Sequence, residues 1–230
     1  MDVRRSGIVV CAALSAAVLW VAGPGASLAG AATGGGECQL QGVANITPPL
    51  SSNSGSFAYN FTGALSSCQS NVAGAPTTGT VSAGVQLPET VTLTNISTGG
   101  TTTGTVLYQE PIPQGSGSCG NSTTAGEALS AWGDGKNTVV DYDTTGALAA
   151  VQLQGTVVAS MTLTLVASSV PAGFTAPATF TISTDEPAFP VGQQSLAALT
   201  FSPTTQDQDC VTKGVSSANI SGAIGIGSAM

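Results

Sequence analysis

The sequence predicts an all-β protein of antiparallel strands, arranged as a β-sandwich or, alternatively, as a partly closed β-barrel. Three observations lead to this prediction. Apolar and polar side chains alternate in run after run of the chain, which is the period of a strand with one buried face. Short turn sequences rich in Gly and Pro separate these runs. Beyond the N-terminal leader, no segment keeps a helical period over several turns.

The first element is a predicted helical signal peptide at residues 1–31. Arg4 and Arg5 supply the positive start, and an apolar run covers residues 8–22. Small residues follow, and Ala29-Gly30-Ala31 fits a cleavage site. The apolar run is shorter than the roughly 20 residues that a membrane-spanning helix needs. We therefore expect cleavage after Ala31, secretion to the extracellular space or cell envelope, and no stable membrane anchor after cleavage.

The rest of the chain is expected to hold a flexible lead-in at residues 32–37 and a single all-β domain at residues 38–228. Two packed halves are the alternative. Clear alternation predicts strands at 38–46, 56–63, 156–166, 174–183 and 217–226. Shorter runs between turn sequences predict further strands at 79–87, 90–96, 104–109, 128–132, 137–143, 147–153 and 195–201.

The polar face of the predicted strands carries mostly Thr, Ser, Asn and Gln. Charged side chains normally protect open sheet edges from pairing with other chains, yet only 7% of the residues are charged. We therefore expect the edges to be covered by loops that contain Pro111, Pro113 and Pro190, or to be removed by barrel closure.

The charge balance excludes several classes of partner. The net charge is −8, and Lys136 and Lys213 are the only basic residues beyond the leader. Nucleic-acid binding and docking on anionic lipid both need clusters of Lys and Arg to neutralise phosphate. We therefore expect no nucleic-acid partner and no lipid-surface partner.

The absence of histidine removes the commonest general base and the commonest metal ligand. Ser-His-Asp and Cys-His catalytic arrangements are therefore excluded, and no cofactor is expected. The sequence Gly115–Gly120 matches the G-x-G-x-x-G pattern of dinucleotide-binding sites, but it opens no helix, so it is interpreted as a loop that carries a disulfide. Whether the protein is an enzyme stays open, with the balance against it.

Cysteine usage agrees with export. Cys11 lies in the leader, and the remaining four are Cys38, Cys68, Cys119 and Cys210. An even number of cysteines in a secreted chain indicates disulfides, and four cysteines allow three pairings. We favour Cys38–Cys68, which joins the start of one strand to the end of the next, together with Cys119–Cys210. A zinc site is disfavoured, because the cysteines lack C-x-x-C spacing.

One candidate ligand surface remains, formed by Trp132, Asp134, Asp141 and Asp143. Asp141 and Asp143 are two residues apart, so they share one face of a strand, with Cα atoms about 6–7 Å apart. A carboxylate pair could hydrolyse a glycoside, and Trp132 could stack on a sugar ring. The simpler interpretation is an exposed strand face beside a buried tryptophan. These acids also lack the order of an EF-hand, so no metal site is expected.

Several motifs resemble those of a broad group of small secreted β-sandwich-like proteins of high-GC Gram-positive bacteria, a group with no established activity. The resemblance covers nearly the whole chain after the leader, and its motifs are structural rather than catalytic. It implies an extracellular location and an all-β fold. The motifs are Cys38-x-Leu-x-Gly42, Asn45–Leu50, Phe57-x-Tyr-x-Phe61 up to Cys68, Trp132-x-x-Gly135-Lys136, Phe189-x-Val191-Gly192, and Cys210 with the terminal strand 217–227.

These observations predict a secreted, acidic, disulfide-stabilised β-protein without enzymatic activity. It would associate with the cell envelope, or bind an envelope glycan or a surface protein. A carboxylate-dependent glycoside hydrolase is the alternative. The sequence leaves the ligand and the oligomeric state open.

Overall fold

The computed structural model describes residues 35–147 and 149–227, so the predicted signal peptide lies outside the described residues. Within the described part of the chain, the only helical element is the 3₁₀ turn η1 (Ala167–Ser169). No described helix has the length and hydropathy to cross a membrane. The strands are β1 (Gly36–Leu50), β2 (Gly55–Ser70), β3 (Gly79–Ala83), β4 (Gln86–Asn95), β5 (Thr101–Gln109), β6 (Gln114–Gly117), β7 (Ser122–Trp132), β8 (Asn137–Ala147), β9 (Ala150–Val158), β10 (Ser160–Leu165), β11 (Phe174–Thr175), β12 (Thr179–Ser183), β13 (Gln194–Pro203) and β14 (Val215–Ile226).

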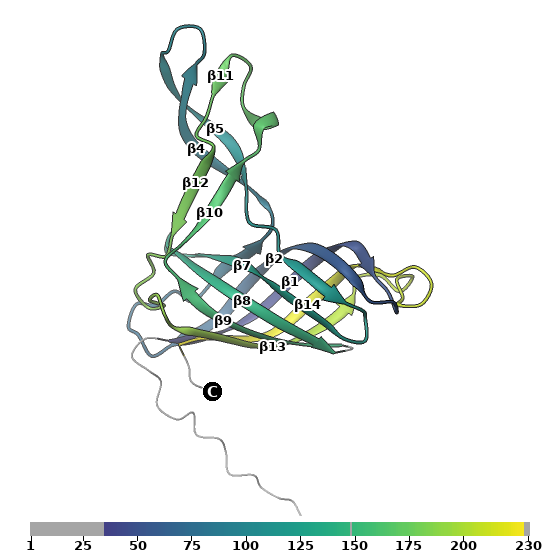
Figure 1. Cartoon of the computed structure of the whole chain (residues 1–230). Helices are drawn as coiled ribbons and strands as arrows, with labels where there is room; N and C mark the ends of the chain where they lie inside the picture. The colour runs from purple at the N-terminus through teal and green to yellow at the C-terminus, as the bar shows by residue number, and fades with distance from the viewer. Residues whose placement is uncertain (1–34, 148, 228–230) are drawn as a thin grey trace, which may run out of the picture.

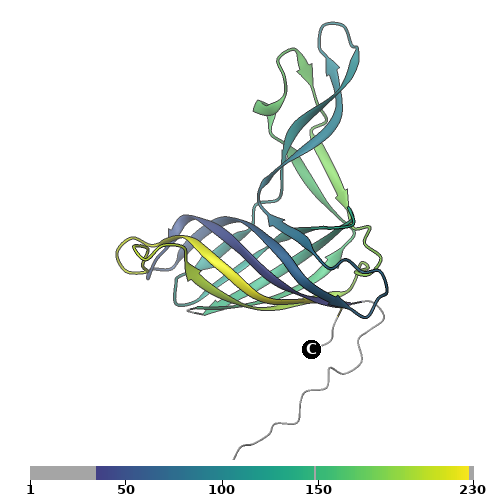
Figure 2. The ribbon, with the colours of Figure 1, turned by 180° about the vertical axis from the view of Figure 1, so that it is seen from behind.

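The main sheet closes on itself. Its strands follow the order β1-β14-β13-β9-β8-β7-β3-β2-β6, every pair is antiparallel, and β1 pairs with β2 as well as with β14. Figure 1 shows the resulting barrel, and Figure 2 shows β1 beside β14 from behind. The predicted all-β antiparallel class is therefore confirmed, with the closed barrel in place of two stacked open sheets. Closure also removes the exposed edges of this sheet.

One position in the barrel wall is shared by two strands. β3 pairs with Phe61–Leu65 of β2, and β6 continues in the same direction along Gly55–Ala58. Both also pair with β7 on their other side, so β3 and β6 together form one of eight positions around the barrel. Between them the wall is completed by Pro113, whose carbonyl accepts a hydrogen bond from the backbone N–H of Tyr59 (N···O 3.2 Å).

A second sheet of five strands stands out from the barrel as an arm (Figure 1). One part, β4–β5, is inserted between β3 and β6, and the other part, β10 to β12, is inserted between β9 and β13. The chain leaves the wall after Ala83 at Gly84, whose φ of 70° lies in the left-handed region that favours glycine. The two parts join where β5 pairs with β10 and where β11 pairs with β4.

The base of the arm covers the outer face of the barrel. Leu129 of β7 and Val139 of β8 point outward, yet they are 5% and 0% exposed. They form one apolar cluster with the arm residues Val106, Met161 and Leu163. Burial of these side chains fixes the arm on β7 and β8, because apolar area removed from water contributes about 25 cal/mol per Å².

Glycines on the inner wall make room for aromatic rings. A Cβ on Gly42 would collide with the ring of Phe61, and a Cβ on Gly79 would lie 2.9 Å from a ring carbon of Trp132. Gly115 stands in the same relation to the ring of Phe57. The barrel therefore packs large side chains of one strand against bare backbone of the next.

The strand predictions need correction where the arm begins and ends. The predicted strand 79–87 is broken at Gly84, and the run 156–166 is divided between β9 and β10. The run 174–183 is divided between β11 and β12, which lie on either side of Pro177. The predicted loop at Gly115–Gly120 is partly strand, because β6 includes residues 114–117 and completes the barrel wall. β1 begins at Gly36, inside the predicted lead-in.

Both predicted disulfides are present. Cys38 and Cys68 join β1 to β2, with their Cα atoms 4.0 Å apart. There β2 carries one extra residue, and Ser67 takes a φ of 51°, so a β-bulge places Cys68 against Cys38. Cys119 and Cys210 join the segment after β6 to the loop between β13 and β14, across 91 residues.

We expect loss of either disulfide to lower the free energy of unfolding, and loss of Cys119–Cys210 to lower it more. In the chain-entropy model the shorter loop contributes about 3.5–4 kcal/mol and the longer loop about 4.5 kcal/mol. Thermal and urea unfolding of Cys38→Ser/Cys68→Ser and Cys119→Ser/Cys210→Ser would measure both values. Cys11→Ser, which breaks neither bond, is the control, and an equal loss in all three proteins would contradict the expectation.

A buried carboxyl group lies where the arm returns to the barrel. Glu110 is 1% exposed, and its carboxylate accepts hydrogen bonds from Ser82 Oγ (2.6 Å) and from the backbone N–H of Val85 (3.0 Å). Burial raises the pKa of Glu110 above its ordinary value, and the two hydrogen bonds only partly oppose this rise. Glu110 thus links β3 to the end of β5, and burial of its ionised carboxylate costs free energy.

We expect the free energy of unfolding of Glu110→Gln to rise relative to that of the native protein as the pH increases from about 4 to about 7. A raised folded-state pKa gives stability that is present below the unfolded pKa and is lost as the carboxyl group ionises. Glutamine mimics the protonated form and keeps both contacts, whereas Glu110→Ala leaves two partly buried donors unpaired and should cost about 1–3 kcal/mol. Urea unfolding at several pH values would measure the difference, and parallel pH profiles for the native protein and Glu110→Gln would contradict it.

Candidate functional site

The interior of the barrel holds a cavity of about 150 Å³. Its wall is almost entirely apolar, no charged side chain lies among the lining residues, and every strand position of the barrel contributes to it. The strands place these side chains inside because residues two apart along a strand share one face. Representative lining residues are Leu40, Ile46, Phe61, Val81, Trp132, Val140, Leu153, Phe189, Leu199 and Ile224.

Four hydroxyl groups form a chain inside this apolar wall. The Tyr142 and Tyr59 hydroxyl oxygens lie 2.6 Å apart, and Tyr59 Oη lies 3.1 Å from Thr124 Oγ1. Thr124 Oγ1 in turn lies 2.7 Å from Thr144 Oγ1. Burial raises the pKa of both tyrosines, so both hydroxyls keep their protons throughout the ordinary pH range.

The four linked hydroxyls have one more proton than their mutual hydrogen bonds use. Each of the four hydroxyls carries one proton, and three contacts between them use three protons. Among the residues that the structure describes, no other hydrogen-bond partner is seen for these hydroxyls. One O–H is therefore available to a group outside the chain.

Ser195 is a second polar feature of the cavity wall. Its side chain is 0% exposed, and its Oγ has no hydrogen-bond partner within the described residues. It lies on β13 among the lining residues. A buried hydroxyl without a partner is costly, so it is a feature that needs an explanation.

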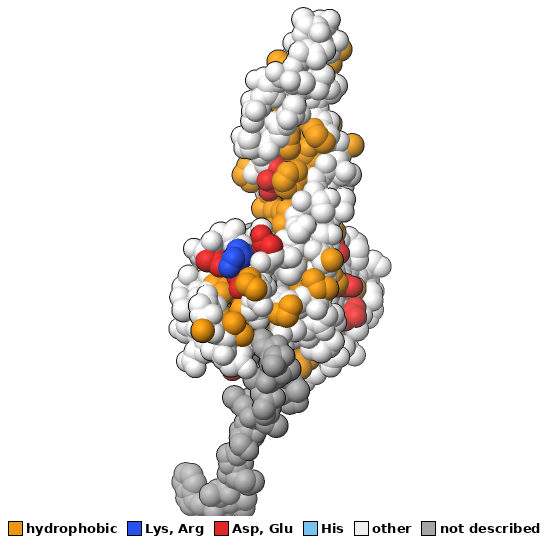
Figure 3. Space-filling model, turned by 90° about the vertical axis from the view of Figure 1, so that its left-hand side faces the viewer, with side chains coloured by type: hydrophobic (Ala, Val, Ile, Leu, Met, Phe, Trp, Pro, Cys, Tyr) orange, Lys and Arg blue, Asp and Glu red, His pale blue; other side chains and the backbone are white. Residues whose placement is uncertain are grey.

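One end of the barrel is closed by the segment between β12 and β13. Phe189 is 2% exposed, and its ring centroid lies 4.8 Å from that of Trp132. Glu186 holds the segment in place: Oε1 accepts the N–H of Ala188 (2.9 Å), and Oε2 accepts a hydrogen bond from Lys136 Nζ (3.3 Å). Lys136 also contacts Asp134 Oδ2 at 2.8 Å. A basic side chain is visible between acidic ones at this end of the barrel (Figure 3).

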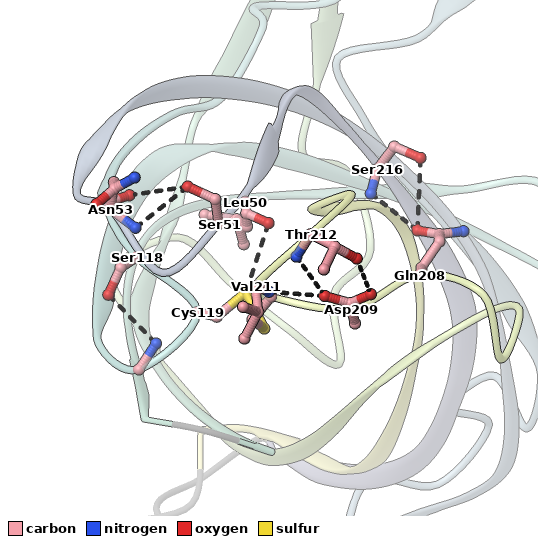
Figure 4. The surroundings of a disulfide bond; sticks show 12 residues. Leu50, Ser51, Asn53, Ser118, Cys119, Gln208, Asp209, Val211, Thr212 and Ser216 are labelled. Atoms are coloured by element: carbon pink, nitrogen blue, oxygen red, sulfur yellow. Dashed lines mark hydrogen bonds between the residues drawn. A yellow bond between two sulfur atoms is a disulfide. The ribbon is translucent and has the colours of Figure 1, made fainter.

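The other end is closed around the Cys119–Cys210 disulfide. The N–H of Cys119 donates to the carbonyl of Ser51 (2.8 Å), and the N–H of Ser52 donates to the carbonyl of Cys210 (2.6 Å). Figure 4 shows these loops beside Leu50, with Asp209 accepting hydrogen bonds from Val211 and Thr212. A hydrogen bond from the Thr212 hydroxyl, together with these two backbone bonds, lowers the pKa of Asp209. The cross-linked loops therefore cover the apolar cluster of Ile46, Leu50, Phe57, Val215 and Ala218.

The structure separates the four residues of the predicted ligand surface. Trp132 is 5% exposed, lines the cavity and donates from Nε1 to Thr138 Oγ1 (2.9 Å). Asp141 and Asp143 are exposed on the outer face of β8, and Asp134 lies in the turn before β8. Trp132 and the β8 acids therefore lie on opposite sides of the barrel wall and do not form one site.

The outer acids have no partner that would give them a chemical role. Glu127 stands opposite Asp141 on the neighbouring strand, and burial, with a smaller contribution from the charge of Asp141, raises the pKa of Glu127. Within the described residues, no group of three or more Cys, Asp or Glu side chains could hold a metal ion. Like charges side by side on an exposed strand are an ordinary feature of an acidic surface.

Sequence reasoning missed the cavity residues Tyr59, Thr124, Tyr142, Thr144 and Ser195. Their inward direction follows from strand alternation, because Tyr59 shares a strand face with Phe57 and Phe61, and Tyr142 shares one with Val140. Their meeting depends on pairing between strands far apart in the chain, since Tyr59 and Tyr142 are 83 residues apart. A polar residue at an inward position, such as Thr124 or Ser195, was the available signal.

The comparisons with known proteins give no relative. No protein family, no curated protein and no solved structure matches this chain. The candidate site is therefore defined by its geometry alone.

We expect Lys136→Met to lower the free energy of unfolding, because it leaves the buried Glu186 carboxylate without its cation. Adding Glu186→Gln should recover part of the loss. Lys213→Met is the matched control, since Lys213 and Asp207 are 63% and 70% exposed and such pairs contribute little. Chemical denaturation of the four proteins measures these effects; equal losses for the two lysine variants would show that Lys136 does not hold the closing segment.

Proposed function

We propose that this protein is exported and binds a small, mainly apolar molecule inside its barrel. The observation that carries the proposal is the apolar cavity of about 150 Å³ inside the barrel. A barrel of eight strands has an interior that side chains can just fill, or that can hold one small ligand. Here the side chains leave a cavity.

The size of the cavity indicates the size of the ligand. Apolar protein cavities of about 150 Å³ stay dry and bind molecules as large as benzene. A single six-membered ring, with one or two small substituents, is therefore the expected scale. Larger ligands such as fatty acids or glycan chains would need the wall to move.

The cavity lowers the stability of the barrel unless something fills it. An unfilled space costs stability, since each lost contact in a core forfeits dispersion energy. The structure keeps this space although it could be filled at positions such as Ala44, Ala83 and Ala128, which all line the cavity. A ligand that occupies the space would recover the lost contacts.

Export is supported by the two disulfides, which are typical of proteins in oxidising compartments. The resemblance to secreted proteins of high-GC Gram-positive bacteria points the same way and remains a proposal. Association with the cell envelope fits an exported carrier of small molecules. The acidic surface repels anionic partners, so a small uncharged ligand is compatible with it.

The two earlier alternatives have less support. Glycan stacking on Trp132 needs an exposed ring, but that ring is packed against Phe189 inside the barrel. Glycoside hydrolysis needs two carboxylates that face one substrate. Asp141 and Asp143 lie on an exposed strand face, and the cavity is lined by no carboxylate.

We expect toluene to bind with a dissociation constant of about 10 µM to 1 mM and to change the fluorescence of Trp132. The experiment uses the full chain with Trp20→Phe, so that Trp132 is the single tryptophan. The isobutyl group of Ala128→Leu should fill part of the cavity and weaken binding by at least about tenfold.

The matched control is Ala125→Leu, which makes the same change on the same strand. Ala125 is exposed on the outer face, whereas Ala128 lines the cavity. Equal binding by the two variants, or no saturable binding by the parent protein, would show that the barrel cavity is not a binding site.

A further inference from the structure

We infer that the ligand of the barrel is an uncharged ring compound with one oxygen substituent, a hydroxyl or a carbonyl, on an otherwise apolar body. This inference rests on the proposed function, because it names the chemical class that the same cavity selects. Two separate polar features carry it: the unpartnered Ser195 hydroxyl and the spare proton of the tyrosine–threonine chain.

Ser195 points to a ligand with a polar atom. Ser195 is among the residues that line the cavity, and its hydroxyl is fully buried with no partner within the described residues. Neighbouring inward residues on the same strand, Ala197 and Leu199, are apolar and buried. A buried hydroxyl at such a position costs free energy unless something bonds to it. An oxygen on the ligand can accept its proton.

The strand register places Ser195 in the same row as Tyr142, one member of the hydroxyl chain. Ser195 of β13 is paired with Gly155 of β9, and Gly155 is paired with Tyr142 of β8. The three residues thus lie in one row across three neighbouring strands, so the Cα atoms of Ser195 and Tyr142 are about 10 Å apart. The side chains of Val140 and Tyr142 cover Gly155, since a Cβ there would lie 2.8 Å from Val140 Cγ1 and 3.1 Å from Tyr142 Cβ.

The hydroxyl chain offers the second bond. Tyr142, Tyr59, Thr124 and Thr144 have four protons for three mutual contacts, so one O–H remains to be donated. Ser195 likewise offers a proton and two lone pairs. Because both features are hydroxyls, they can donate to a carbonyl, and they can donate to or accept from a ligand hydroxyl.

Charged ligands do not fit this site. No charged side chain lines the cavity, so a carboxylate or an ammonium group would be buried without a counter-ion. A wholly apolar ring would leave Ser195 and the spare proton unpaired. A neutral ring alcohol or ketone can bond to either group and still bury its body against Leu, Ile, Val and aromatic side chains.

The test compares cyclohexanol with methylcyclohexane, which replaces the hydroxyl by a methyl group of similar size. Both are titrated into the full chain with Trp20→Phe, and Trp132 fluorescence and calorimetry report binding. The variants are Ser195→Ala and Tyr142→Phe. The control is Ser202→Ala, because Ser202 lies on the same strand but is exposed.

We expect Ser195→Ala to weaken cyclohexanol binding by about 3- to 10-fold, the effect of one net hydrogen bond. Methylcyclohexane should bind this variant at least as tightly as it binds the parent protein. Tyr142→Phe should also weaken cyclohexanol selectively, because it removes the hydroxyl that lies in register with Ser195 and leaves the spare proton with Tyr59, Thr124 and Thr144, outside that row. Ser202→Ala should change neither ligand. Because Ser195 Oγ has no partner within the described residues, Ser195→Ala should unfold at the same temperature as the parent or higher, so a loss of binding would not reflect unfolding.

The outcomes separate the two proposals. If methylcyclohexane binds and the Ser195 and Tyr142 variants bind cyclohexanol as the parent does, lumen binding stands and the choice of an oxygen-bearing ligand is wrong. Tighter binding of cyclohexylammonium or cyclohexanecarboxylate than of cyclohexanol would also overturn that choice. If neither neutral ring binds, the proposed function itself fails.

Discussion

Closure of one antiparallel sheet into a ring is the constraint on which the rest of the structure depends. It requires β1 to pair on both sides, with β2 and with β14, so the two ends of the domain are locked together. Every inward side chain then faces a space of fixed width. Aromatic rings fill much of that space by lying over glycines such as Gly42 and Gly79, and the part left unfilled is the cavity.

The two disulfides secure this ring in different ways. Cys38–Cys68 clamps neighbouring strands beside the end that Phe189 covers, because all three belong to one apolar cluster. Cys119–Cys210 holds loops together over the opposite end. A protein with so few charged side chains has little help from surface ion pairs, so covalent links and a closed sheet take on more of the stabilisation.

Local patterns predicted much of the fold and little of the site. Alternation identified strands as far apart as 38–46 and 217–226, and cysteine position identified both bonds. The arm was not foreseen, because 79–87 and 156–166 continue their alternation through the points where the chain leaves the wall. Trp132 was correctly weighed as buried, but the partners of Tyr59 and Tyr142 depend on register between distant strands, which no single run of sequence encodes.

The arm is built from two stretches of chain that are separated by β6 to β9. Each stretch alone would expose its side of the β5–β10 junction, and would leave part of the apolar cluster over Leu129 and Val139 open to water. Loss of one stretch would thus destabilise the other. In descent the two insertions should be inherited as a pair, and a shortened natural form of this barrel should lack both of them together.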